Sequence, residues 1–214
     1  MEQKITRDIS SLRRRLLLMG GQVEQLVTRS FQSLVEGDRG LAKEVRIEDH
    51  EIDEMEIDVE AECLEILALD QPVASDLRLV LAVMRINTNL ERISDLAGGV
   101  AKRGSKITKA HEVFDMPTAV PEMMEATKLM LHNAIESFAH DDALLARKVR
   151  EADDKVDDLR KDVLDWAQEN AAKLTATSIS LITVATKIER IADLATNIAE
   201  DVIFMIEGEV VRHS

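Results

Sequence analysis

The chain has 214 residues, of which 45% are hydrophobic and only 2% aromatic. This hydrophobic fraction supports a folded core and excludes wholesale disorder, and the scarcity of aromatic residues favours helices packed on helices over a sheet. The formal net charge of −14 at pH 7 argues against a nucleic-acid-binding protein and against a phosphate site built from side chains alone.

Six long helices are predicted in chain order. Hydrophobic residues recur with a helical period between short turn-forming stretches, and no segment of useful length alternates as a strand would. The turns contain Gly37, Gly40, Pro72, Pro117 and Pro121, and Gly104 is predicted to close the third helix. The predicted helices lie near residues 5–36, 39–69, 74–103, 118–140, 142–169 and 174–207.

The first and last helices show the clearest apolar stripes. In each, apolar residues recur at spacings of three and four, which is typical of helices that pack nearly antiparallel or as coiled coils. The predicted core stripes are Ile5, Ile9, Leu12, Leu16, Met19, Val23 and Leu26 in the first helix, and Ile188, Ile191, Ala195, Ile198, Val202 and Met205 in the last.

The two halves of the chain resemble each other. Residues 38–53 match residues 142–157, 104 positions later, with seven of sixteen pairs identical. Residues 91–97 (ERISDLA) match residues 189–195 (ERIADLA), 98 positions later, with six of seven identical. We therefore predict an all-α protein of two pseudosymmetric three-helix bundles, with the first repeat at 1–106 and the second at 107–214.

Each repeat carries two pairs of carboxylates spaced four residues apart. At about 100° per residue, the pair in each ERI(S/A)DLA segment lies on the side of the helix opposite the core stripe, and the other pair lies on the flank of a helix that could be its neighbour. In the first repeat the pairs are Asp49 with Asp53 and Glu91 with Asp95; in the second they are Asp153 with Asp157 and Glu189 with Asp193.

Clustered carboxylates repel one another unless a cation neutralises them. Oxygen ligands suit hard ions such as Mg²⁺, Mn²⁺, Ca²⁺ or ferric iron, so a metal site is one reading. The other reading is an ordinary solvated acidic face, or surface ion pairs with nearby arginines. The candidate arginines are Arg46, Arg92, Arg150 and Arg190. Both readings stay open at this stage.

Other catalytic and targeting patterns are absent from the sequence. No histidine follows a glutamate at the Glu-x-x-His spacing of di-iron bundles, and there is no phosphate-binding glycine loop or nucleophile elbow. We therefore predict a non-enzyme with no catalytic residues. A single cysteine, Cys63, is expected in the core, and the absence of a signal peptide or long apolar segment favours a cytoplasmic protein without direct membrane insertion.

Three segments carry a family resemblance: LLLMGGQVEQLVTRSFQSLVEGD at 16–38, QPVASDLRLVLAVMRINTNLERISDLAGGVAKR at 71–103 and TKIERIADLATNIAEDVIFMIEGE at 186–209. They resemble the PhoU family of bacterial phosphate-transport regulators. The combination of QPxAxDLR with two ERIxDLA segments is specific to that family, and the resemblance covers essentially the whole chain.

The resemblance implies a cytoplasmic adaptor that restrains the phosphate-starvation response. Its implied partners are the ATPase subunit of the phosphate ABC transporter and a sensor histidine kinase, and a homodimer is expected. Some family members bind metal ions at E(D)xxxD motifs, so the eight carboxylates named above become candidate ligands for Fe, Mn, Mg, Zn or Ca, which the sequence does not distinguish. The alternative is a metal-binding or storage bundle without a phosphate-specific role, and no docking surface is assigned.

Overall fold

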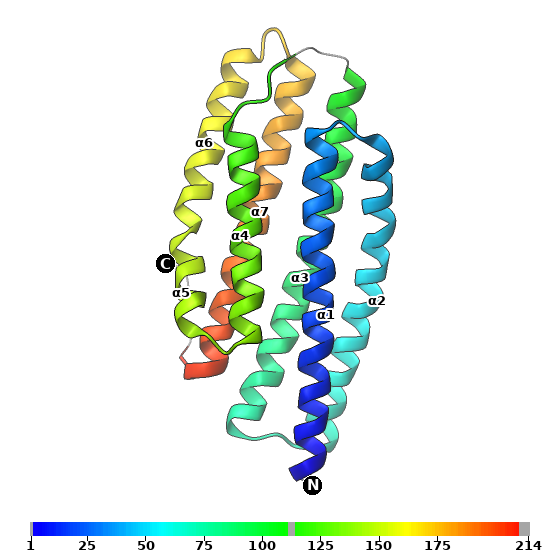
Figure 1. Ribbon diagram of the computed structural model, residues 1–214, viewed down its shortest axis with the longest axis vertical. Coiled ribbons are helices and arrows are strands. Elements are labelled where there is room, and N and C mark those ends of the chain that lie inside the picture. Colours follow the sequence, from blue (N-terminus) through cyan, green and yellow to red (C-terminus); the bar gives the residue numbers. More distant parts are fainter. Residues whose placement is uncertain (1, 111–113, 210–214) are drawn as a thin grey trace.

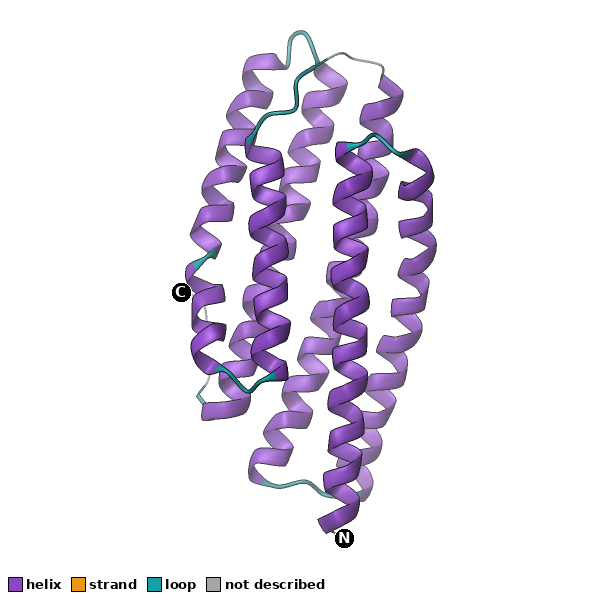
Figure 2. Cartoon of the chain, in the orientation of Figure 1, coloured by secondary structure: helices purple, strands orange, loops and turns teal. Residues whose placement is uncertain are grey.

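The structure, a computed structural model, describes residues 2–110 and 114–209, and within those ranges it contains helices and loops but no strand (Figure 2). The prediction of an all-α chain is confirmed. The helices are α1 (Glu2–Val35), α2 (Arg39–Leu69), α3 (Ala74–Ala110), α4 (Ala119–Ala139), α5 (Ala143–Glu151), α6 (Asp153–Asn170) and α7 (Thr175–Glu207).

The helices form two bundles that share a long central contact. Helices α1, α2 and α3 pack on one another, and α4, α5, α6 and α7 form the second bundle. Helices α3 and α7 run antiparallel and side by side through the middle of the molecule (Figure 1). Helix α1 packs on α3 and helix α4 packs on α7, and both lie nearer the viewer in Figure 1. Two pseudosymmetric three-helix bundles are therefore present. In the second bundle, α5 and α6 together take the place that the single helix α2 has in the first.

The predicted apolar stripes form the core, except for Ile5 at the start of α1, which is only partly buried and lies outside it. Leu12, Met19 and Val23 of α1 are buried, as are Ile188 and Ile198 of α7, and Cys63 is fully buried in α2. Burial raises the pKa of the Cys63 thiol to about 12, in keeping with a core residue. Among the described helices, none combines the length and the apolar character that spanning a membrane requires.

The end predicted for the third helix at Gly104 is wrong, because α3 continues to Ala110. Gly104 is buried where α3 crosses α1, and a Cβ added to it would lie 3.1 Å from the Cα of Leu34. Glycine inside a helix costs conformational entropy, but here it lets two backbones approach closely. Gly104 therefore marks a helix contact and not a helix stop.

Overpacking this contact should destabilise the fold. We expect Gly104→Val to lower the free energy of unfolding by about 1–3 kcal/mol, because its side chain meets backbone that cannot rotate away. The control is Gly21→Val in α1, where an added Cβ has no atom within 4 Å. Urea denaturation should show the control within about 0.5 kcal/mol of the wild type. Equal losses in both variants would contradict the assigned role of Gly104.

The single helix predicted over residues 142–169 is also wrong, since the structure divides it into α5 and α6 at Ala152. The backbone N–H of Ala152 lies 3.1 Å from the carbonyl oxygen of Val149 and 3.2 Å from that of Lys148, which closes α5. Asp153 and Asp154 then occupy the first turn of α6. A helix N-terminus attracts carboxylates, so this acidic stretch favours a new helix start.

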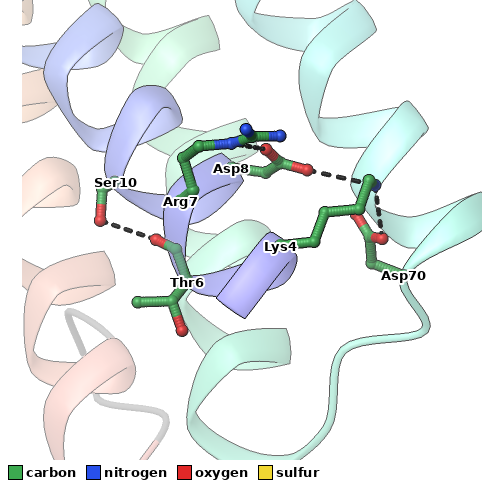
Figure 3. Close-up of polar contacts among 6 residues, drawn as sticks. All are labelled: Lys4, Thr6, Arg7, Asp8, Ser10 and Asp70. Carbon is green, nitrogen blue, oxygen red and sulfur yellow. Dashed lines mark hydrogen bonds and ion pairs between the residues drawn. The ribbon is translucent and has the colours of Figure 1, made fainter. Parts of the chain in front are cut away.

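Ion pairs fix the start of α1 to the end of α2. The Lys4 ammonium lies 2.7 Å from Oδ1 of Asp70, the residue that caps α2, and 3.2 Å from Oδ2 of Asp8 one turn along α1 (Figure 3). The Ser10 hydroxyl donates to the carbonyl of Thr6 at 2.7 Å (Figure 3). The Lys4–Asp70 pair joins the two helices at this end of the bundle, and the contacts with Asp8 and Thr6 lie within α1.

Candidate functional site

The four carboxylates predicted in the first repeat come together between α2 and α3, and a fifth joins them. We call this group the first acid cluster: Asp49, Asp53 and Glu56 from α2, with Glu91 and Asp95 from α3. The Asp49 side chain extends from α2 to α3, where its Oδ1 accepts a hydrogen bond from the Ser94 hydroxyl. Its Oδ2 would lie 3.6 Å from a Cβ added at Gly98.

The electrostatics of the first acid cluster disfavour its fully ionised form. Burial raises the pKa of Asp49, and Asp95 and Asp53 raise it further, although the Ser94 hydrogen bond opposes them. Burial also raises the pKa of Glu91, with the charges of Asp95, Glu56 and Asp53 adding to it and that of Arg92 opposing. The cluster thus holds more negative charge than its surroundings compensate.

The second repeat builds a similar group between α6 and α7. We call it the second acid cluster: Asp153 and Asp157 from α6, with Glu189 and Asp193 from α7. It differs in one decisive neighbour, Arg160, whose Nε lies 3.8 Å from Oε2 of Glu189. Burial raises the pKa of Glu189 and Arg160 opposes that rise, whereas Asp193, Asp157 and Asp153 add to it.

The two clusters are therefore related but not equivalent. Arg160 stands 104 positions after Glu56, so the same repeat position carries a carboxylate in one half and a guanidinium in the other. Ala192 stands 98 positions after Ser94, so the hydroxyl that binds Asp49 has no counterpart. The first acid cluster carries the larger uncompensated charge. The Ser94/Ala192 difference lies within the aligned ERI(S/A)DLA segments, and extending the other alignment three positions past residue 53 would have revealed Glu56 opposite Arg160.

The structure places the eight predicted residues in two clusters but does not assemble a metal site from them. In the described part of the chain, no three His, Cys, Asp or Glu side chains converge closely enough to hold a metal ion. Metal binding stays a prediction. Of the arginines proposed as alternative partners, Arg150 pairs with Glu200 at 3.2 Å and not with the acid clusters, while Arg160 was missed.

A groove lies between the two repeated helices at the centre of the molecule. Its volume is about 750 Å³, and we call it the α3/α7 groove. Most of its lining residues are repeat pairs separated by 98 positions. They are Arg92, Asp95 and Leu96 from α3, and Lys187, Arg190, Asp193, Leu194 and Asn197 from α7.

Comparison with known proteins decides the family of this chain. The model of the PhoU domain matches it twice, over residues 16–104 and 120–202. The chain belongs to the PhoU family. Each match covers one of the two bundles, in keeping with the duplication in the sequence.

PhoU relatives match over the full length of the chain. A protein of Pseudomonas putida, named phosphate-specific transport system accessory protein PhoU homolog, is 34% identical over 217 residues, covering 100% of this chain and 84% of its own. A protein of the same name from Pseudomonas aeruginosa is 35% identical, covering 100% of this chain and 89% of its own. The resemblance stated for the sequence is confirmed.

Solved PhoU structures share the fold. The crystal structure of PhoU from Pseudomonas aeruginosa superposes with a TM-score of 0.90 at 34% identity, covering 95% of this chain and 99% of that one. The phosphate transport system regulatory protein PhoU from Streptococcus pneumoniae superposes with a TM-score of 0.91 at 22% identity, covering 98% and 100%. The second comparison supports the fold alone.

Proposed function

We propose that this protein is a non-enzymatic accessory regulator of phosphate uptake. The observation that carries the proposal is the match of the PhoU domain to both bundles, together with full-length relatives named phosphate-specific transport system accessory proteins. No nucleophile paired with a base was found in the sequence, so the carboxylates and the groove are better suited to binding than to catalysis.

In detail, we propose a cytoplasmic adaptor that restrains the phosphate-starvation response when phosphate is plentiful. Its partners would be the ATPase subunit of the phosphate ABC transporter and a sensor histidine kinase. The support is the family membership and the strongly acidic net charge, which favours recognition of basic surfaces on partner proteins. The homodimer stays a prediction.

Binding to the transporter tests this proposal directly. We expect the purified chain to bind the purified ATPase subunit of the phosphate transporter from the same organism saturably, and not the ATPase subunit of an unrelated ABC transporter. The interaction should weaken as salt rises, because charged surfaces carry it. Equal binding to both subunits, or to neither, would count against the adaptor role.

A second candidate function is cation binding at the first acid cluster. Its support is that these five carboxylates lack a lysine or arginine ion pair in the described part of the chain, whereas Arg160 lies beside the second acid cluster. Because no three of them converge, the side chains would have to move together around an ion. The ion class is a hard cation bound by oxygen atoms.

Replacing Glu91 separates repulsion from cation binding. With EDTA at neutral pH, we expect Glu91→Gln to raise the free energy of unfolding by a few tenths to about 1 kcal/mol, because it removes one of several repelling charges. Since the folded pKa of Glu91 is raised, this gain should appear only above the pKa of an unfolded glutamate and vanish in acid. Thermal unfolding across pH measures it.

The second repeat supplies the matched control for this variant. In EDTA, Glu189→Gln should raise the free energy of unfolding by less than Glu91→Gln does, because Arg160 already offsets part of the repulsion on Glu189. Added Mn²⁺ should stabilise the wild type more than Glu91→Gln, as ligand linkage requires. If Mn²⁺ stabilises both proteins equally, or neither, the first acid cluster is a solvated acidic face and not a cation site.

A further inference from the structure

The α3/α7 groove gathers positive charge in a protein whose formal net charge is −14. Arg92, Lys187 and Arg190 line it, and Lys102 and Arg103 are near enough to act on Lys187. Asp95 and Asp193 also line the groove, so its charged lining is three cations and two carboxylates. Cations are therefore in excess here, in contrast to the chain as a whole.

Several arginines elsewhere on the surface form ion pairs between helices. Most of those that reach a neighbouring helix end on a carboxylate, with distances of 2.6 to 3.2 Å for the pairs Arg13–Asp141, Arg15–Glu62, Arg29–Glu44, Arg147–Glu207 and Arg150–Glu200. The net positive lining of the groove suits an anion from outside the chain.

Lys187 is seated in the groove by a glycine. Its side chain crosses from α7 onto α3 at Gly99, where an added Cβ would lie only 2.5 Å from the Lys187 Nζ. The Lys187 ammonium group therefore lies beside Gly99 of α3 and adds a cation to the groove.

The duplication places two guanidinium groups on opposite walls. Arg92 and Arg190 occupy the same repeat position, and both line the groove. Their helices α3 and α7 run antiparallel side by side (Figure 1). Planar guanidinium groups bind the oxygens of phosphate in pairs of hydrogen bonds. Two of them facing one groove can hold a tetrahedral oxyanion from both sides.

The carboxylates in the same groove narrow the choice of anion. Asp95 lines the groove beside the cations, and an ionised carboxylate can only accept hydrogen bonds. Near neutral pH, phosphate keeps at least one O–H that can donate to such a carboxylate. Sulfate has no proton to donate and would meet Asp95 as a like charge. A groove of mixed sign therefore favours phosphate over sulfate.

We infer that the α3/α7 groove binds inorganic phosphate, with Arg92, Arg190 and Lys187 on its oxygens and Asp95 accepting its hydroxyl hydrogen. This site goes beyond the proposed adaptor role. It shares Asp95 with the first acid cluster, but its cations come from Arg92, Arg190 and Lys187, which belong to neither cluster. It also revises the expectation from net charge, because that charge is an average over a surface on which cations are locally concentrated.

Calorimetric titration of the full chain with sodium phosphate tests the site. At neutral pH and low ionic strength we expect saturable binding, with sulfate at least about tenfold weaker. The double variant Arg92→Gln with Arg190→Gln should weaken phosphate binding at least about tenfold, because both guanidinium forks are lost. Both arginines are exposed, and circular dichroism should show the variant folded.

The control variant carries the same change in net charge outside the groove. Arg14→Gln with Arg39→Gln replaces two other exposed arginines and should leave the affinity within about twofold. The inference is overturned by an absence of saturable phosphate binding, by sulfate binding of equal strength, or by an equal loss in the control. Binding of an acidic peptide in place of phosphate would also overturn it. The transporter-binding assay is run without phosphate, so the two proposals can fail separately.

Discussion

Ile191→Ala should lower the free energy of unfolding by about 2–5 kcal/mol, the largest change expected for a single side chain here. Ile191 belongs to the second ERI(S/A)DLA segment and is 0% exposed in α7, the helix that packs along α3 at the centre of the molecule. Removing three of its carbons leaves a cavity that two long helices cannot close without shifting. Its repeat partner Ile93, also 0% exposed, should respond in the same way.

The same substitution on the surface gives the control. Ile57 in α2 is 62% exposed, and Ile57→Ala should change the free energy of unfolding by less than about 0.5 kcal/mol. Urea denaturation followed by circular dichroism measures all three variants. A loss below about 1 kcal/mol for both Ile191→Ala and Ile93→Ala would show that the α3–α7 contact is not the core that joins the two bundles.

Asp201→Asn should stabilise the protein above neutral pH by up to about 3 kcal/mol. Burial raises the pKa of Asp201 to about 6, although Arg85, whose Nη1 lies 3.2 Å from its Oδ1, opposes the rise. The folded protein therefore holds this proton more tightly than the unfolded chain does. Wild-type stability should fall as pH rises from about 4 to about 6 and then level off.

The asparagine variant removes that pH dependence while keeping an oxygen that can accept from Arg85. At pH 4 the two proteins should be nearly equal in stability, and the advantage of Asp201→Asn should grow through pH 6. Asp165→Asn replaces an exposed aspartate of α6 and should follow the wild-type curve. Parallel curves for Asp201→Asn and the wild type would show that Asp201 carries no buried charge.

Local patterns in the sequence were enough to predict the fold. In α1, the apolar stripe that includes Leu12 and Leu16 recurs with a helical period and is buried. The spacing of that stripe therefore predicts both the helix and the face of the helix that packs in the core. Gly104 shows where that logic ends. A glycine that stops a helix and a glycine that admits a neighbouring helix look alike in sequence, and only the position of Leu34 distinguishes them.

The acid clusters could also be predicted from local spacing in the sequence, whereas the α3/α7 groove could not. Spacing of four residues placed Glu91 with Asp95, and the repeated motif suggested Asp49 and Asp53 as their neighbours. Arg92 and Arg190, in contrast, are 98 residues apart, and only the antiparallel packing of α3 and α7 brings them to one groove. Net charge, a sum over the chain, hides such local segregation.

The proposed role in phosphate uptake can be tested most directly in cells. Expression of phosphate-starvation genes should be measured in phosphate-rich medium, in the parent strain, in a strain lacking this gene, and in that strain carrying the gene on a plasmid. Loss of the gene should switch these genes on despite ample phosphate, and the plasmid copy should silence them again. Unchanged expression in the deletion strain would contradict the proposal that this protein regulates phosphate uptake.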